Sequence, residues 1–257
     1  MGISEFEGKC AFITGAASGM GLRFSESWAA QGGNVLMCDI DEEALTQKAA
    51  SVSERGPGRA VAFVCDVRRY EDITAARDRA VEEFGRIDIT VSFAGGTAVR
   101  VRCVDREKYP EFPDVPIEVF DWGLDVNLRA QLYVAHAVLK QMREQKSGLI
   151  VNIGSITGEE GDGYGVEYGT AKSGAMYGLT KSLAQYGARY GIRCVCVSPG
   201  PVLTRPAMAN MKTLLGRAAD PQEIVDLILY LASEKGSFIN GTNIMIDGGR
   251  NAMGRWH

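Results

Sequence analysis

The feature that most constrains this chain is an alternation of short apolar runs with longer amphipathic segments. The runs are CAFIT, NVLMCD, AVAFVCD, IDITVSFAG, GLIVNIGS, RCVCVSPG and TNIMID, with helical patterns such as GLRFSESWAAQG and PQEIVDLILYLASEKG between them. Strands that are apolar on both faces and alternate with helices are typical of a parallel sheet covered on both sides. The sequence therefore predicts a single α/β domain over residues 1–257, a doubly wound sheet of seven parallel strands with helices on both faces.

Composition narrows the classes of partner. The 257 residues are 46% hydrophobic and 23% charged, and the net charge is −4, so neither nucleic acid nor an anionic membrane is an expected partner. No apolar run reaches the roughly 18 residues of a membrane span, and the N-terminus does not have the pattern of a signal peptide. We therefore expect a cytoplasmic protein.

Cysteines and histidines give no pattern of a metal site. Five of the six cysteines fall in apolar runs and Cys103 falls in an expected loop, which favours buried, reduced thiols over a disulfide framework. Only two histidines are present. We predict neither a bound metal nor a Ser–His–Asp triad.

Three segments interrupt the alternation. Residues 96–116 carry Pro110, Pro113 and Pro116, and residues 156–166 and 199–217 each follow an apolar run without clear periodicity. In a doubly wound sheet, the loops that leave the carboxyl ends of strands surround the ligand crevice. We expect these three segments to be substrate loops.

A glycine-rich turn, TGAASGMG, joins the first apolar run to the first helical pattern. Gly15, Gly19 and Gly21 allow a tight turn and the close approach of a phosphate, and the helix behind them directs free N–H groups at it. Ser18 and Met20 belong to the same turn. A glycine-rich turn can be purely structural, but its place after the first strand favours dinucleotide binding.

Acidic residues end the next two strands. Asp39 follows the glycine turn at close to the roughly 20-residue offset at which a carboxylate meets the adenosine ribose, and it would repel a 2′-phosphate. This favours NAD over NADP, with Ile40 beside it. Asp66 and Val67 are expected near the adenine, although Asp66 can equally be a solvated carboxylate at a strand end.

The pattern tyrosine–three residues–lysine occurs twice, as Tyr168–Lys172 and as Tyr177–Lys181. Residues four apart share one face of a helix, so either pair could be an acid–base device. The pairs lie about half a helical turn apart in direction, so at most one lines a given pocket. Tyr168 follows Ser155, at the end of an apolar run, by one short loop. The Tyr168 pair is therefore predicted to be functional, and the Tyr177 pair to point away.

At this point the chain resembles the short-chain dehydrogenase/reductase family. The resemblance rests on the ordered set Thr14–Gly21, Ser155, Tyr168-x-x-x-Lys172 and SPG at 198–200, and it spans nearly the whole chain. It implies a Rossmann-like domain that transfers a hydride between NAD and a secondary alcohol or its ketone.

The resemblance also implies roles for individual residues. Tyr168 would be the general acid/base, with its phenolate favoured by the Lys172 ammonium. Ser155 would hold the substrate oxygen. Asn127 would seat a water in a proton relay, unless it is an ordinary buried helix asparagine. Further cofactor contacts are implied at five positions: Ala94, Gly95, Pro199, Val202 and Thr204. One departure stands out, because Ser92-Phe93 replaces the family's usual Asn-Asn before Ala94.

The substrate is left open among several classes. The polar side chains of 156–166 suit a sugar or polyol, which is the favoured substrate class, but for these residues themselves the favoured interpretation is that they are solvated; they are Thr157, Glu159, Glu160, Asp162 and Tyr164. The apolar residues after SPG suit a hydroxysteroid or a 3-oxoacyl substrate. The segment 96–116 also carries three arginines, Arg100, Arg102 and Arg106. They could contact an anionic substrate, but contact with solvent is the favoured interpretation.

Two further expectations concern a non-catalytic alternative and the oligomeric state. A non-catalytic NAD-binding scaffold or redox sensor is a remote alternative, disfavoured by the complete set Ser155, Tyr168 and Lys172. The resemblance implies a homotetramer or homodimer built on two long helices, at 117–145 and 167–190.

Overall fold

A single parallel sheet organises the molecule. The computed structural model describes residues 5–253, and within them seven strands pair in the order β3-β2-β1-β4-β5-β6-β7. Every pairing is parallel. The strands are β1 (Cys10–Thr14), β2 (Asn34–Asp39), β3 (Ala60–Val64), β4 (Ile89–Ser92), β5 (Gly148–Ile153), β6 (Ile192–Pro199) and β7 (Asn243–Ile246). The chain order reverses direction between β1 and β4, which is the point where a doubly wound sheet opens its ligand crevice.

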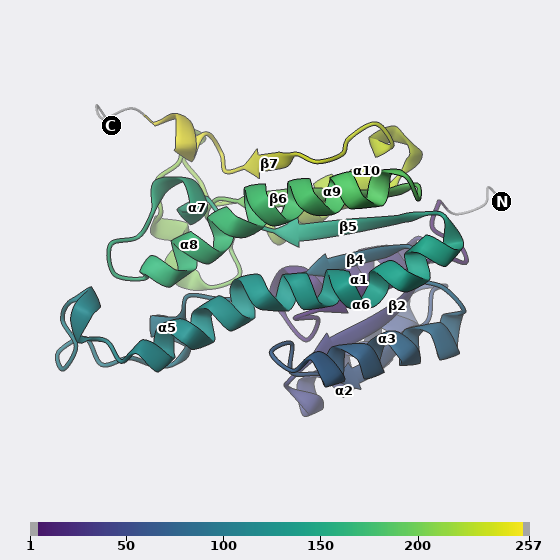
Figure 1. Cartoon of the computed structure of the whole chain (residues 1–257), viewed down its shortest axis with the longest axis horizontal. Coiled ribbons are helices and arrows are strands. Elements are labelled where there is room, and N and C mark those ends of the chain that lie inside the picture. Colours follow the sequence, from purple (N-terminus) through teal and green to yellow (C-terminus); the bar gives the residue numbers. More distant parts are fainter. Residues whose placement is uncertain (1–4, 254–257) are drawn as a thin grey trace.

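Helices cover both faces of the sheet, as predicted (Figure 1). On one face pack α1 (Gly19–Ala30), α2 (Glu42–Arg55) and α10 (Pro221–Ala232), in a core that includes Phe24 and Trp28. On the other face pack α3 (Tyr70–Phe84), α6 (Ala130–Gln145) and α9 (Thr180–Ala188). Both cores are built from the predicted apolar runs. β1 is buried along its whole length.

Local signals in the sequence set the helix ends. Asp41 caps α2 by accepting a hydrogen bond from the Ala44 N–H at 3.1 Å. Asp220 and Glu223 form a reciprocal capping box at the start of α10, which satisfies N–H groups that have no partner within the helix. α3 ends at Gly85, whose φ of +73° is the left-handed conformation that glycine adopts at little cost.

The two predicted long helices are each interrupted by a π-helical turn. The turn Asp125–Arg129 lies between α5 (Ile117–Leu124) and α6, and the turn Ala175–Leu179 lies between α8 (Val166–Gly174) and α9. π-turns insert a residue and occur often at functional sites. Both turns adjoin the elements that carry the predicted active site. No helix among residues 5–253 is both long enough and apolar enough to cross a membrane.

The three predicted loops are more ordered than expected. Segment 96–116 contains α4 (Ala98–Val101) and a 3₁₀ turn at Phe112–Asp114. Segment 156–166 contains α7 (Thr157–Glu160), and segment 199–217 contains the 3₁₀ turn Pro206–Asn210. Each is a single turn, too short to give the hydrophobic periodicity by which helices are identified.

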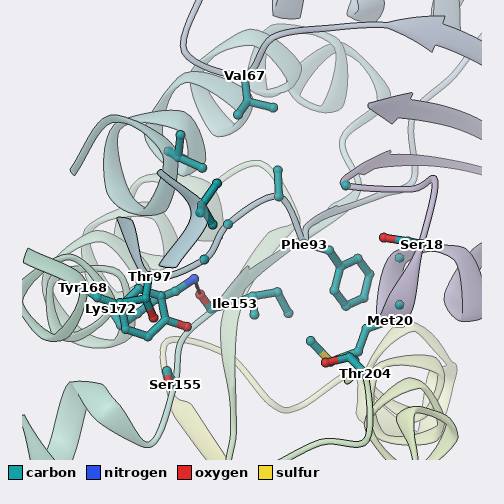
Figure 2. Close-up of a pocket in the computed structure, with 18 of the residues that line it drawn as sticks. Ser18, Met20, Val67, Phe93, Thr97, Ile153, Ser155, Tyr168, Lys172 and Thr204 are labelled. Carbon is teal, nitrogen blue, oxygen red and sulfur yellow. Dashed lines mark hydrogen bonds between the residues drawn. The ribbon is translucent and has the colours of Figure 1, made fainter. Parts of the chain in front are cut away.

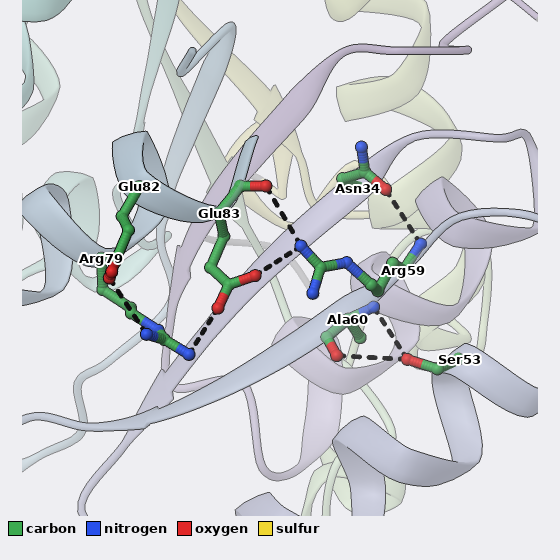
Figure 3. A network of polar contacts seen from close by, with 7 residues as sticks. All are labelled: Asn34, Ser53, Arg59, Ala60, Arg79, Glu82 and Glu83. Atoms are coloured by element: carbon green, nitrogen blue, oxygen red, sulfur yellow. Dashed lines mark hydrogen bonds and ion pairs between the residues drawn. The ribbon is translucent and has the colours of Figure 1, made fainter. Parts of the chain in front are cut away.

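Polar contacts fasten the opposite, amino-terminal edge of the sheet (Figure 3). Arg59, just before β3, forms an ion pair with Glu83 at the end of α3 and donates to its carbonyl at 3.1 Å. The Arg59 N–H donates to the Asn34 Oδ1 at 3.0 Å, at the start of β2. Exposed pairs of this kind contribute little each. These contacts lie at the amino-terminal edge of the sheet, opposite the carboxyl edge where the ligand crevice opens.

Candidate active site

The glycine turn lies at the carboxyl end of β1 with little space around it. Gly15 has a φ of +69°, and a Cβ atom on it would lie 2.6 Å from the Ala94 nitrogen. A Cβ atom on Gly21 would collide with the carbonyl oxygen of Gly15. The turn therefore requires glycine at both positions, and it leaves the backbone open toward the pocket at the start of α1. This cradle fits the diphosphate of a dinucleotide.

The two strand-end aspartates are held differently. The Asp39 carboxylate accepts hydrogen bonds from the Ala17 N–H at 3.0 Å and the Ile40 N–H at 2.8 Å, which fixes its orientation at the end of β2. The Asp66 carboxylate is paired with Arg68. A hydrogen bond from Arg68 is the main reason that the pKa of Asp66 lies below its usual value.

One pocket of about 600 Å³ joins these features to the predicted catalytic residues. Figure 2 shows Ser155, Tyr168 and Lys172 grouped with Thr97, apart from the region of Ser18 and Met20. Every cofactor-binding residue predicted from the sequence lines it: Gly15, Ser18, Gly19, Met20, Gly21, Asp39, Ile40, Asp66, Val67, Ala94, Gly95, Tyr168, Lys172, Pro199, Val202 and Thr204. The carboxyl ends of β1 to β6 bring these residues together.

Ser155, Tyr168 and Lys172 meet at one end of this pocket. Ser155 follows β5 and is buried, while Tyr168, on α8, is partly exposed to the pocket. Lys172 is one turn further along α8 and is only 3% exposed. Its ammonium donates to the Ile153 carbonyl at 2.8 Å and lies 5.6 Å from the centre of the Tyr168 ring. The arrangement therefore places a cation beside a phenol and next to a serine hydroxyl.

The electrostatics of this group differ from the expectation. Burial raises the pKa of Tyr168, and interaction with the Ser155 hydroxyl and the charges of Arg100 and Arg205 act against this increase. The sequence predicted that Lys172 would supply the main opposing charge. Burial lowers the pKa of Lys172 itself to about 8, because a desolvated ammonium is less stable than one in water. Burial therefore favours the protonated form of Tyr168.

Asn127 does not line the pocket among the described residues. It is fully buried in the first π-turn, where its side chain donates to the Gly96 and Gly123 carbonyls at 2.9 Å and accepts from the Gly96 N–H at 3.0 Å. A Cβ atom on Gly95 would lie 2.8 Å from the Asn127 Oδ1 and 3.5 Å from the Lys172 Nζ. The Asn127 side chain thus fixes the turn after β4 close to Lys172.

A buried glutamine, Gln131, links Asn127 to Ile153 at the end of β5. It was not identified from the sequence. Its amide donates to the Asn127 carbonyl at 2.6 Å and to the Ile153 carbonyl at 3.2 Å, and its oxygen accepts from the Ile153 N–H at 2.9 Å. Ile153 also carries the carbonyl that holds Lys172. A polar residue four positions after Asn127, among apolar neighbours in a helix, is the signal that could have identified it.

Ser92 and Phe93, where the family usually has Asn-Asn, affect side-chain packing more than the path of the backbone after β4. Ser92 is buried at the end of β4, and the Phe93 ring lies 6.1 Å from that of Phe24 in α1. The Phe93 N–H still donates to the Thr14 carbonyl at 3.1 Å. The backbone at Ala94 therefore passes close to Gly15 as the predicted site requires, and Phe93 lines the pocket.

The second tyrosine–lysine pair lies outside the pocket, as the helix geometry predicted. Tyr177 is 38% exposed, and its hydroxyl bonds to the carboxylate of Glu159 on α7. The Lys181 ammonium lies 5.7 Å from the centre of the Tyr177 ring. This pair forms a contact between α7 and the α8–α9 helix.

The acidic residues of 156–166 contact the protein itself. Glu159 bonds to Tyr177, Glu160 is paired with Arg250, and Asp162 accepts from the Tyr164 N–H at 2.9 Å. The hypothesis that they face the substrate is not supported, because none of them lines the pocket. Sequence proximity to Ser155 was a poor guide, since α7 and the turn after it direct these side chains to other partners.

Tyr164 and the proline-bearing segment stabilise one another. The Tyr164 hydroxyl donates to the Tyr109 carbonyl at 2.6 Å, and the Arg106 guanidinium lies 4.1 Å from the centre of the Tyr164 ring. Arg106 is thus held on an aromatic face. Of the three arginines that the sequence offered in this segment, only Arg100 lines the pocket.

The known proteins that are similar to this chain are dehydrogenases and reductases. A family model described as enoyl-(acyl carrier protein) reductase matches residues 15–251. Trans-4-hydroxycyclohexanecarboxylate dehydrogenase of Sinomonas cyclohexanicum is 38% identical over 95% of this chain and 93% of its own, and 7alpha-hydroxysteroid dehydrogenase of Bacteroides fragilis is 34% identical over 96% of both. An NAD+-bound xylitol dehydrogenase structure superposes with a TM-score of 0.84 and 29% identity, over 95% of this chain and all of that one.

The chain belongs to the short-chain dehydrogenase/reductase family. It is an oxidoreductase that acts on CH–OH groups with a nicotinamide cofactor. The Rossmann-like fold predicted from the sequence is confirmed. No group of three or more metal-ligating side chains occurs within residues 5–253.

Proposed function

We propose that this enzyme transfers a hydride between NAD(H) and a small secondary alcohol or its ketone, with Tyr168 as general acid/base. The observation that carries the proposal is the convergence of Ser155, Tyr168 and Lys172 at one end of a pocket that also holds the glycine turn and Asp39. These groups serve proton transfer, charge stabilisation and dinucleotide binding in one continuous space.

The chemistry follows from the positions of these side chains. When bound, NAD+ would supply the hydride acceptor and a positive charge that favours the Tyr168 phenolate. In oxidation, the Tyr168 phenolate takes the proton of the substrate hydroxyl. Ser155 donates a hydrogen bond to the oxygen on which negative charge develops. Lys172, held by the Ile153 carbonyl at 2.8 Å, keeps its ammonium beside the phenolate.

Preference for NAD is supported at the other end of the pocket. Asp39 lies where the adenosine ribose is expected, and its carboxylate would repel a 2′-phosphate. The cation that lines this end, Arg68, is already paired with Asp66. A 2′-phosphate would therefore meet a fixed negative charge, with the nearest guanidinium in the lining engaged elsewhere.

The substrate class is proposed from the relatives. The similar proteins are named for a polyol, a hydroxysteroid and a hydroxylated ring acid, so a sugar or polyol, a steroid and a ring alcohol are all within the family's reach. A 3-oxoacyl substrate remains the further alternative.

Assembly and location are also part of this proposal. We infer a cytoplasmic homotetramer or homodimer that meets along the α5–α6 and α8–α9 helices. Three side chains on these helices, Leu132, Tyr177 and Tyr186, leave 46%, 38% and 39% of their surface exposed. Light scattering on the purified enzyme tests this, and a monomer at micromolar concentration would contradict it.

The experiment that tests the reaction is a spectrophotometric assay of NADH formation. The enzyme is offered NAD or NADP with matched panels of polyols, ring alcohols, hydroxysteroids and hydroxy acids. We expect oxidation of secondary alcohols with NAD and a much higher kcat/KM for NAD than for NADP. Preference for NADP would contradict the role of Asp39, and absence of turnover with every panel would contradict the proposed function.

A further inference from the structure

The substrate end of the pocket carries positive charge with no acidic counterpart. Near Tyr168, the pocket lining includes Thr97, Arg100, Val101, Arg205 and Met208. Among the described residues that line the pocket, the only carboxylates are Asp39 and Asp66, which end β2 and follow β3. The chain as a whole carries a net charge of −4, so a cationic pocket end in it is a local arrangement and not a general property of its surface.

Arg100 and Arg205 reach this space from different elements. Arg100 lies on α4, and a Cβ atom on Gly96 would lie 2.7 Å from its guanidinium, so the side chain folds back over the turn that leads from β4. Arg205 precedes the turn Pro206–Asn210 after β6. The charges of both are close enough to Tyr168 to act on its pKa, and they also act on each other.

Neither guanidinium is neutralised by the protein. Within residues 5–253, no ion pair involves Arg100 or Arg205. Arg68, in the same pocket, is paired with Asp66. The nearby Glu167 is buried and accepts from the Ala98 N–H at 3.1 Å, so it holds α4 in place and does not pair with Arg100. Two like charges that share a cavity without a counter-ion favour the binding of an anion.

We propose, on the basis of the proposed function, that the substrate is a carboxylate-bearing secondary alcohol whose carboxylate is bound by Arg100 and Arg205. Its hydroxyl faces Ser155 and Tyr168, and its hydrocarbon part packs against Val101 and Met208. The reaction balances: the C–H hydride passes to NAD+, the hydroxyl proton passes to Tyr168, and the products are an oxo acid, NADH and a proton. Planar guanidinium groups match a carboxylate with paired hydrogen bonds.

The test compares acids with uncharged esters of the same shape. NAD-dependent oxidation is measured for 4-hydroxycyclohexanecarboxylate, for shorter hydroxy acids, and for the methyl ester of each. The enzymes are wild type, Arg100→Leu, Arg205→Leu, the charge-retaining Arg100→Lys and Arg205→Lys, and Arg106→Leu as the control on the same segment. NADH binding by fluorescence and thermal unfolding are recorded for every variant.

We expect wild type to prefer at least one acid over its ester by about 10- to 100-fold in kcat/KM. The preference should fall toward one in each Leu variant, persist in part in the Lys variants, and be unchanged in Arg106→Leu, with NADH binding retained throughout.

Oxidation of the esters at equal or higher kcat/KM in every pair would overturn the inference while the proposed function stands. So would a preference for acids that survives in both Leu variants. Loss of NADH binding in Arg205→Leu would assign that arginine to the cofactor and overturn its role here. No turnover of either member of any pair would contradict the proposed function, and the inference with it.

Discussion

Replacing Gln131 with leucine tests whether this buried amide holds the catalytic end of β5. In Gln131→Leu, the Ile153 N–H and the Asn127 carbonyl lose the side-chain partners that they have at 2.9 and 2.6 Å. Each buried group left unpaired costs about 1–3 kcal/mol, and the added apolar surface of leucine offsets about 1–2 kcal/mol. We expect a net loss of about 2 kcal/mol in the free energy of unfolding.

For a chain of this length, that loss corresponds to a decrease of about 4–8 °C in Tm. Thermal unfolding at one fixed protein concentration measures it, with Gln141→Leu on the same helix as a control that should change Tm by less than about 2 °C. Because Ile153 also holds Lys172, kcat should fall as well, while KM for NAD changes little. A Tm within 1–2 °C (roughly 0.5 kcal/mol) of wild type together with full activity would refute the positioning role of Gln131.

Three further predictions follow from the same geometry. Asp39→Ala should raise kcat/KM for NADP and lower it for NAD, measured by steady-state kinetics with both cofactors. Gly21→Ala should abolish NADH binding, followed by fluorescence, because its Cβ atom would collide with the Gly15 carbonyl. Alcohol oxidation needs the Tyr168 phenolate, which forms as the pH rises, and the Lys172 ammonium, whose charge is lost above its pKa of about 8, so kcat/KM should pass through a maximum as the pH increases; a profile that rises without limit would contradict this.

Much of the fold could be predicted because each strand of a parallel sheet is an apolar run. The glycine turn, Asp39 and the Tyr168 pair were also predictable, since their positions relative to strand ends follow from the element order alone. Helix periodicity was sufficient to separate Tyr168 from Tyr177. These inferences depend on local spacing, and local spacing is what the sequence specifies most directly.

The features that could not be predicted depend on contacts between distant segments. The residues of 156–166 suited a polar substrate, but Glu159 bonds to Tyr177 in the second π-turn and Glu160 pairs with Arg250 near the C-terminus. Arg205 could not be identified from the sequence, because its proposed role depends on the segment after β6 and α4 lining the same pocket. The hydrogen bonds of the Asn127 side chain to the backbone of Gly96 and Gly123 likewise depend on contacts that local spacing does not specify.

The most direct test of the account is turnover in Tyr168→Phe and Tyr177→Phe, compared with wild type on one oxidised secondary alcohol. Loss of the general acid/base should lower kcat in Tyr168→Phe by at least about 10²- to 10⁴-fold, with NADH binding and Tm close to wild type. Tyr177→Phe should retain full activity. Wild-type turnover in Tyr168→Phe, or an inactive but folded Tyr177→Phe, would contradict the assignment of Tyr168 as the catalytic residue.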